Sequence, residues 1–148
     1  MSYSKEVSKK LNELLEKNYD AEKGYKLAAE KVKNSRLKSY FESRAKDRYD
    51  FGHELKSEIA NFGGTPDKGT SVAGDIHRGW INLKTSLSGD KDEAVLEEAI
   101  RGEKASVEEY EEVLNESEIP ASTANILMKQ KNSITSALEE VKTMEDWA

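Results

Sequence analysis

The sequence predicts an all-α fold, a four-helix bundle made of two antiparallel helical hairpins joined by a long crossover that contains a short helix. Four long stretches each carry one apolar stripe at spacings of three and four residues, the pattern of a helix that buries a single face. Short turns link the stretches within each pair, and such turns make antiparallel neighbours. The glycine-rich stretch from Gly63 to Gly89 separates the two pairs.

Composition narrows the classes of protein to consider. A chain of 148 residues predicts one domain over residues 1–148. Its net charge of −6 argues against nucleic acid or an anionic membrane as a partner. The lack of cysteine excludes disulfides, thiolate metal sites and cysteine nucleophiles. Without an apolar signal segment or a membrane-length apolar run, we expect a soluble, cytoplasmic protein.

The first helix is expected from about Ser4 to Val32. The same spacing that defines its stripe also places Asn18 and Glu22 on the buried face. The apolar members of the stripe are Leu11, Leu15, Tyr25, Ala29 and Val32.

The second helix is expected from about Ser35 to Asn61, after an N-cap signal at Asn34-Ser35. Arg44 and Arg48 fall in register with its stripe, and Phe62-Gly63-Gly64 ends it, because glycine adopts the left-handed cap conformation readily. The apolar members are Leu37, Phe41, Phe51, Leu55, Ile59 and Phe62.

The third helix is expected from about Asp92 to Asn115, with Glu103 on its stripe. The fourth is expected from about Ala121 to Met144, with Gln130 on its stripe, because Pro120 suits a first helical turn. The long joint between the hairpins allows the second and third helices to be parallel neighbours. The apolar stripe members are Leu96, Ala99, Ile100, Val107, Tyr110, Val113, Leu114, Ile126, Leu127, Ile134, Ala137, Leu138 and Val141.

The crossover has its own amphipathic pattern, which predicts a short helix whose apolar face must be covered. Trp80 is either a core anchor or an interface residue, since amphipathic aromatics suit both places. His77 and Arg78 lie beside that face, and we interpret His77 as a contact residue rather than a metal or anion ligand. Because two-fold dimers are the commonest oligomers, we expect a homodimer with this helix at or near the interface. The apolar face is Val72, Ile76, Trp80, Leu83 and Leu87.

Three segments carry a family resemblance: Leu55 to Gly64 (LKSEIANFGG), Gly69 to Leu87 (GTSVAGDIHRGWINLKTSL) and Glu97 to Glu103 (EEAIRGE). They make nearly the whole chain resemble the DUF2383 proteins, a bacterial family of four-helix bundles of unknown function. The single long crossover between hairpins also resembles the ferritin-like fold. Ferritin-like relatives suggest a stress-related role, by analogy of fold.

The ferritin-like resemblance also implies a di-iron motif, a Glu on each of two helices and a Glu-x-x-His on each of the other two. Glu22 and Glu103 fit the two single carboxylates. The corresponding pairs are Arg48 with Phe51 and Gln130 with Ser133, which supply neither carboxylate nor imidazole. If any metal binds, Glu22 and Glu103 are its candidate ligands.

A buried polar network is therefore predicted in place of a metal site. A buried carboxylate is costly unless paired, and one guanidinium can serve two carboxylates. We expect Arg48 to pair with Glu22 and Glu103. Asn18, Arg44, Gln130 and either Tyr25 or Tyr110 would complete the layer. The alternative is a shifted register in which these groups reach solvent at the rim of the bundle.

Two further patterns are interpreted as solvated faces. Asp50-x-x-His53 has metal-ligand spacing but lies opposite the stripe, and the acidic run from Glu108 to Glu112 lies on an outer face. No catalytic residues are assigned. The sequence thus favours a non-catalytic protein without a cofactor that works through oligomerisation or protein interaction. The alternative is an iron-dependent oxidoreductase or metal-storage protein of ferritin type.

Overall fold

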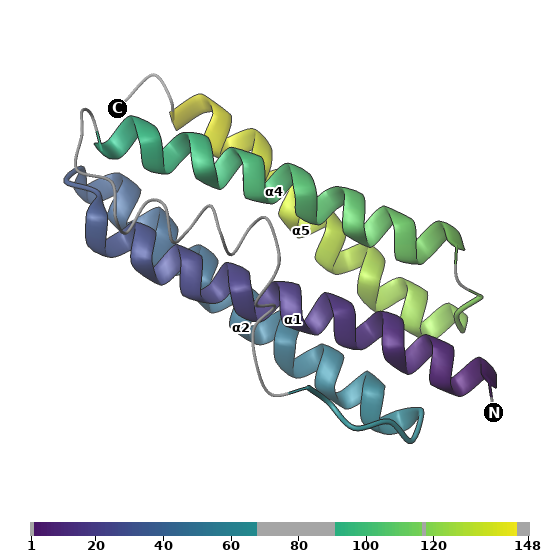
Figure 1. The fold of residues 1–148 in the computed structure, drawn as a ribbon. Coiled ribbons are helices and arrows are strands. Elements are labelled where there is room, and N and C mark those ends of the chain that lie inside the picture. The colour runs from purple at the N-terminus through teal and green to yellow at the C-terminus, as the bar shows by residue number, and fades with distance from the viewer. Residues whose placement is uncertain (1, 68–90, 117, 145–148) are drawn as a thin grey trace.

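The computed structural model describes residues 2–67, 91–116 and 118–144, and these residues form four long helices (Figure 1). The helices are α1 (Ser2–Lys31), α2 (Ser35–Asn61), α4 (Lys91–Glu116) and α5 (Ala121–Met144). The predicted all-α bundle is confirmed, with each boundary within two residues of expectation. The predicted crossover helix, with His77, Arg78 and Trp80, lies outside the described residues. Within the described ranges, no helix is apolar over the length that a bilayer span requires.

The helices occupy the corners of a square. The hairpin partners α1 and α2 pack together, as do α4 and α5, and the hairpins meet through α1 with α4 and through α2 with α5. The expectation that the second and third helices are neighbours is wrong: α2 and α4 run in the same direction but lie at opposite corners (Figure 1). Any contact between them must cross the centre of the bundle.

The buried residues follow a seven-residue repeat with alternating steps of four and three, which is typical of helices that pack nearly parallel. On α1 the repeat starts at Val7 and continues to Val32 beyond the helix end. We call the inward face formed by this repeat on the four helices the seam. Its buried members are Val7, Leu11, Leu14, Asn18, Ala21, Tyr25, Ala28, Val32, Leu37, Phe41, Arg44, Arg48, Leu55, Leu96, Ala99, Glu103, Ser106, Tyr110, Val113, Thr123, Leu127, Gln130, Ile134, Ala137, Val141 and Met144.

Side-chain caps fix the turn between α1 and α2. Asn34 is the N-cap of α2, and its Oδ1 accepts hydrogen bonds from the backbone N–H groups of Arg36 at 2.9 Å and Leu37 at 3.2 Å. The carboxylate of Asp92, in the first turn of α4, accepts from the N–H groups of Lys33 at 2.8 Å and Asn34 at 3.1 Å. The α4–α5 hairpin, through Asp92, thus stabilises the turn between α1 and α2.

Loss of the Asn34 cap should lower stability measurably. Asn34→Ala removes the acceptor for two N–H groups that no helical carbonyl serves, so we expect the free energy of unfolding to fall by about 1 kcal/mol. Urea denaturation followed by circular dichroism measures this. The matched control is Ser35→Ala at the adjacent exposed position, which should stay within about 0.5 kcal/mol of the parent. Equal effects of the two substitutions would contradict the capping role.

Candidate functional site: a buried polar layer

A layer of polar side chains crosses the middle of the seam. Asn18, Arg44, Arg48, Glu103, Ser106 and Gln130 are all at least 95% buried. A hydrophobic cluster lies on each side. One contains Tyr25, Phe41, Leu96 and Val141, and the other contains Leu11, Leu55, Val113 and Leu127. All four helices therefore contribute polar groups to one level of an otherwise apolar core.

Arg48 is the centre of this layer. Its Nη2 donates to Glu103 Oε1 at 2.6 Å and to Ser106 Oγ at 2.9 Å. Its Nη1 donates to Asn18 Oδ1 at 2.9 Å. The long side chain thus spans the diagonal of the bundle from α2 to α4. Charge-assisted bonds of this length are the stronger class of protein hydrogen bond.

Arg44, one helical turn before Arg48, supplies a second guanidinium. Its Nη2 lies 3.4 Å from Glu103 Oε2, and its Nη1 lies 2.5 Å from Asp47 Oδ2. The Asp47 side chain is 42% exposed, so the layer reaches solvent on this side. Two arginines and two carboxylates balance, which is the condition for keeping charges in a bundle core.

Neutral groups extend the layer to the opposite side. Asn18 Nδ2 donates to the hydroxyl of Tyr110 at 2.9 Å, and that hydroxyl donates to Gln130 Oε1 at 2.7 Å. Gln130 Nε2 then donates to Glu54 Oε1 at 2.9 Å, on the exposed side of α2. A continuous chain of polar contacts therefore runs through the bundle from Asp47 to Glu54.

The layer keeps arginine charged and tyrosine neutral. Burial alone would lower the pKa of Arg48, but the charge of Glu103 and the hydrogen bond with it raise that pKa above its usual value. Burial, and then the charge of Glu103, raises the pKa of Tyr25 well above its usual value. Burial raises the pKa of Tyr110 to about 12 although Arg48 and Asn18 oppose the shift. The Tyr110 hydroxyl therefore keeps its proton and remains a donor to Gln130.

Not every donor in the layer is satisfied. The Nε atoms of Arg44 and Arg48 are buried and have no hydrogen-bond partner among the described residues. Each buried unpaired donor costs about 1–3 kcal/mol. The polar layer therefore lowers the stability that this part of the core could have. A fully apolar layer of the same volume often gives a protein that is as stable or more stable.

Glu22 is the one predicted member that the structure does not bring into the layer. Its side chain is 17% exposed and accepts a hydrogen bond from Lys26 Nζ at 2.9 Å. The seam passes through Asn18, Ala21 and Tyr25, so Glu22 lies one residue beyond it, in an outer groove between α1 and α2. The predicted stripe has the same seven-residue period but continues from Leu15 to Glu22, whereas the seam continues from Leu14 to Ala21. Leu14 and Leu15 are both apolar and both buried, so the spacing alone did not separate the two alignments.

The polar layer also contains residues that were not predicted from the sequence. Ser106 lies on the seam three residues after Glu103, so a seven-residue repeat would have found it. Asp47 and Glu54 lie beside the seam of α2 and are identified only through their partners Arg44 and Gln130. No spacing rule in the sequence selects them.

Two other sequence motifs lie on outer faces. His53 is exposed and packs its ring against Tyr49, while Asp50 pairs with Lys46 at 3.2 Å. In the acidic run, Glu109 pairs with Lys17 at 3.3 Å and Glu111 with Lys131 at 3.2 Å. Neither motif gathers the three ligands that a metal ion needs.

Comparison with known proteins identifies the family. The sequence profile of a domain of unknown function, DUF2383, matches residues 6–116. The chain belongs to the DUF2383 family. No curated protein matches the sequence significantly.

Solved structures show that this DUF2383 bundle has a ferritin-like fold. A mutant of Dps1 from Mycobacterium smegmatis superposes with a TM-score of 0.78 at 14% identity, covering 97% of each chain. A ferritin-like, diiron-carboxylate protein from Bacillus anthracis str. Ames superposes with a TM-score of 0.72 at 23% identity, covering 98% of this chain and 99% of the other. At these identities the likeness concerns the fold.

The residues of the polar layer do not fit a di-iron centre. Both carboxylate oxygens of Glu103 already face guanidinium groups, and the facing positions on the other helices hold Asn18, Arg48 and Gln130. Iron in such bundles takes carboxylate and imidazole ligands. Among the described residues, no three side chains of the metal-binding types are grouped to hold an ion.

The pairing of Arg48 with Glu103 can be tested by a double-mutant cycle. Arg48→Met leaves Glu103 buried without its closest partner, so we expect the free energy of unfolding to fall by about 3–5 kcal/mol. Adding Glu103→Met should recover much of that loss, since Arg44 retains Asp47 and the polar layer then holds no unpaired carboxylate. Urea denaturation of the two single variants and the double variant gives the coupling energy.

Glu22→Gln is the matched control, because Glu22 was predicted for the same network and instead forms a surface pair. It should change stability by less than about 0.5 kcal/mol. Strictly additive effects of Arg48→Met and Glu103→Met would contradict the buried pair. So would a loss from Arg48→Met no larger than that from Glu22→Gln.

Proposed function

We propose that this protein is a non-catalytic, ferritin-like bundle that works as a homo-oligomer or through contacts with other proteins, in the cytoplasm. The observation that carries the proposal is the contact of 2.6 Å between Arg48 and Glu103 at the centre of the bundle. In this chain a guanidinium takes the central position among the facing side chains. The centre of the fold is then a structural element, and function lies on the surface.

The electrostatics of the layer support this proposal. A divalent ion about 4 Å from the Arg48 guanidinium would be repelled by about 8 kcal/mol at an effective dielectric constant of about 20. The ion would also have to displace Arg48 and Arg44 from Glu103, its one central carboxylate. Leaving those guanidiniums buried and unpaired adds a further penalty. Iron chemistry at this level is therefore disfavoured by the residues themselves.

The second candidate function is that of an iron-dependent oxidoreductase or a metal-storage protein. It is favoured by the superposition on a structure described as a diiron-carboxylate protein and by the buried carboxylate of Glu103. For this candidate to hold, iron would have to rearrange the layer. A stress-related role fits either candidate by analogy of fold alone.

Iron binding separates the two candidates. We expect protein purified from iron-supplemented cells to contain far less than one iron per chain, and ferrous iron to cause no oxygen consumption above that of buffer. Elemental analysis and an oxygen electrode make the two measurements. About two irons per chain in the parent, lost in Glu103→Gln, would overturn the non-catalytic proposal and locate the metal at this layer.

Oligomerisation is tested at the predicted crossover helix. We propose a homodimer in which Trp80, with His77 and Arg78 beside it, lies at or near the two-fold interface. Trp80→Ala should then remain folded by circular dichroism but become monomeric by light scattering. Tyr49→Ala is the control, since Tyr49 is a large aromatic that is 51% exposed on α2, and it should stay dimeric. A parent that is monomeric at high concentration would remove the dimer.

A further inference from the structure

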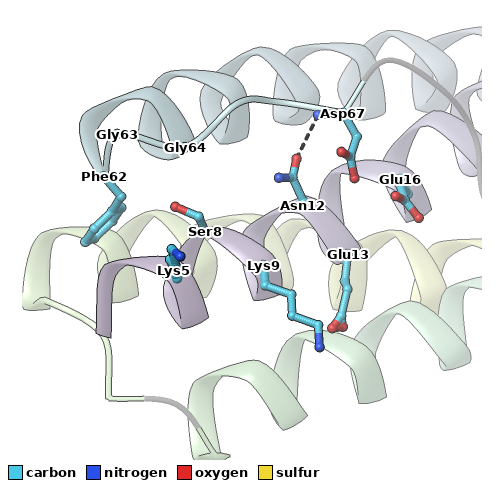
Figure 2. Close-up of a pocket in the computed structure, with 10 residues that line it drawn as sticks. All are labelled: Lys5, Ser8, Lys9, Asn12, Glu13, Glu16, Phe62, Gly63, Gly64 and Asp67. Carbon is cyan, nitrogen blue, oxygen red and sulfur yellow. Dashed lines mark hydrogen bonds between the residues drawn. The ribbon is translucent and has the colours of Figure 1, made fainter. Parts of the chain in front are cut away.

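One face of α1 outside the seam holds the segment that follows α2. Its polar members, Asn12, Glu16 and Tyr19, recur at three- and four-residue spacing and so share a face. Asn12 Nδ2 donates to the carbonyl of Thr65 at 3.1 Å. The N–H of Asp67 donates to Asn12 Oδ1 at 2.8 Å (Figure 2). The hydroxyl of Tyr19 donates to the carbonyl of Asp67 at 3.1 Å. We call residues 62–67 the strap.

The strap lies close against α1 at its start as well. Gly63 has φ of 77°, a conformation that glycine adopts without steric cost. A Cβ on Gly64 would stand 2.6 Å from Ser8 Oγ and 3.1 Å from a methyl of Ile59. The strap is therefore held against α1 by close packing at Gly64 and by three hydrogen bonds at Thr65 and Asp67.

This attachment brings two carboxyl groups together. Because the N–H and the carbonyl of Asp67 are both bonded to α1, its side chain stands beside Glu16, at one end of a groove of about 500 Å³ (Figure 2). Neither carboxyl group has an ion-pair partner within 4.0 Å among the described residues. Two like charges so placed cannot both ionise without penalty.

Charged groups of both signs line the grooves beside Glu16, and the acidic groups are those that shift its pKa. From α1, Glu13 and Asp20 add negative charge, while Lys5, Lys9, Lys10 and Lys17 lie along the same grooves. From α4, Glu109 and Glu112 line the neighbouring groove, and Glu109 takes Lys17 as its own partner at 3.3 Å. The hydrogen bond with Asp67, then burial, then the charges of Asp67, Asp20 and Glu13 raise the pKa of Glu16 to about 7.

We propose that Glu16 and Asp67 form a proton-dependent latch that holds the strap on α1. When the two carboxyl groups share a proton, a hydrogen bond joins them and the strap is closed. When both are ionised, repulsion opposes the three remaining hydrogen bonds and the strap opens more often. The latch would control the start of the connection between the two hairpins and access to the groove beneath it.

The direction of the pH dependence follows from linkage. A carboxyl group whose pKa is higher in the closed state than in the open state binds more protons when closed. For Glu16 the closed value is about 7 and the ordinary value is 4.5. The contribution of the latch is therefore complete below about pH 4.5 and is lost as the pH rises through about 7.

Hydrogen exchange at the Asp67 amide tests the latch directly, because this N–H is bonded to Asn12 when the strap is closed. The full chain is studied by NMR from pH 5.5 to 8.5 with EDTA, and each rate is divided by its intrinsic rate. We expect the protection factor of Asp67 to fall by at least about tenfold over this range. The Val32 amide, bonded to the carbonyl of Ala28 at 3.1 Å, reports on opening of the bundle and should not follow this change.

Two variants distinguish the latch from a general effect of acidity. Glu16→Gln keeps a side chain that donates to Asp67 without titrating, so protection at Asp67 should become independent of pH. Glu13→Gln removes a charge from the same groove and should keep most of the pH dependence. A parent whose Asp67 protection does not change between pH 5.5 and 8.5 would overturn the proposal. So would a Glu16→Gln variant that keeps the fall of the parent.

Discussion

The buried contact between Arg48 and Glu103 is the interaction on which the rest of the structure depends. It joins two helices that share no side of the bundle, so it can form only when both hairpins are in place. Asn18, Ser106 and Arg44 take positions that satisfy this pair, and Tyr110 and Gln130 satisfy Asn18 in turn. Breaking one partner leaves an uncompensated buried charge, which is far more costly than the net gain from the intact pair.

The pair also explains how four similar helices reach one register. A seam of leucine, alanine and valine repeats every seven residues, so sliding one hairpin by a heptad would still bury apolar groups. The two hydrophobic clusters supply most of the driving force but discriminate poorly between such registers. A slid hairpin would place Arg48 or Glu103 against an apolar cluster. We therefore interpret the polar layer as a device that selects the register at some cost in stability, as single polar seam residues do in coiled coils.

The sequence predicts most of this architecture because its signals are local. Asn34, Pro120 and the glycines after Phe62 mark helix ends, and the stripes identify Asn18, Arg44, Arg48, Glu103 and Gln130 as inward-facing. The prediction for Glu22 is wrong because Leu14 and Leu15 are both apolar, and the predicted stripe continued from Leu15 to Glu22 whereas the seam continues from Leu14 to Ala21. The diagonal placement of α2 and α4 and the contact of Glu16 with Asp67 join residues about 50 positions apart, and no local pattern in the chain encodes such pairs.

A fold that superposes on a diiron-carboxylate protein is here closed at its centre by its own arginines. Fold and chemistry are separable in this way because the helices are held by the seam, and the central layer needs only to be neutral and hydrogen-bonded. Carboxylates with iron would meet that condition, and carboxylate with guanidinium meets it without a ligand. Because guanidinium groups fill the centre in this way, the titratable groups that can respond to pH lie outside it. Glu16 and Asp67 are such groups, because they lie near solvent and because their charge decides how firmly the strap is attached to α1.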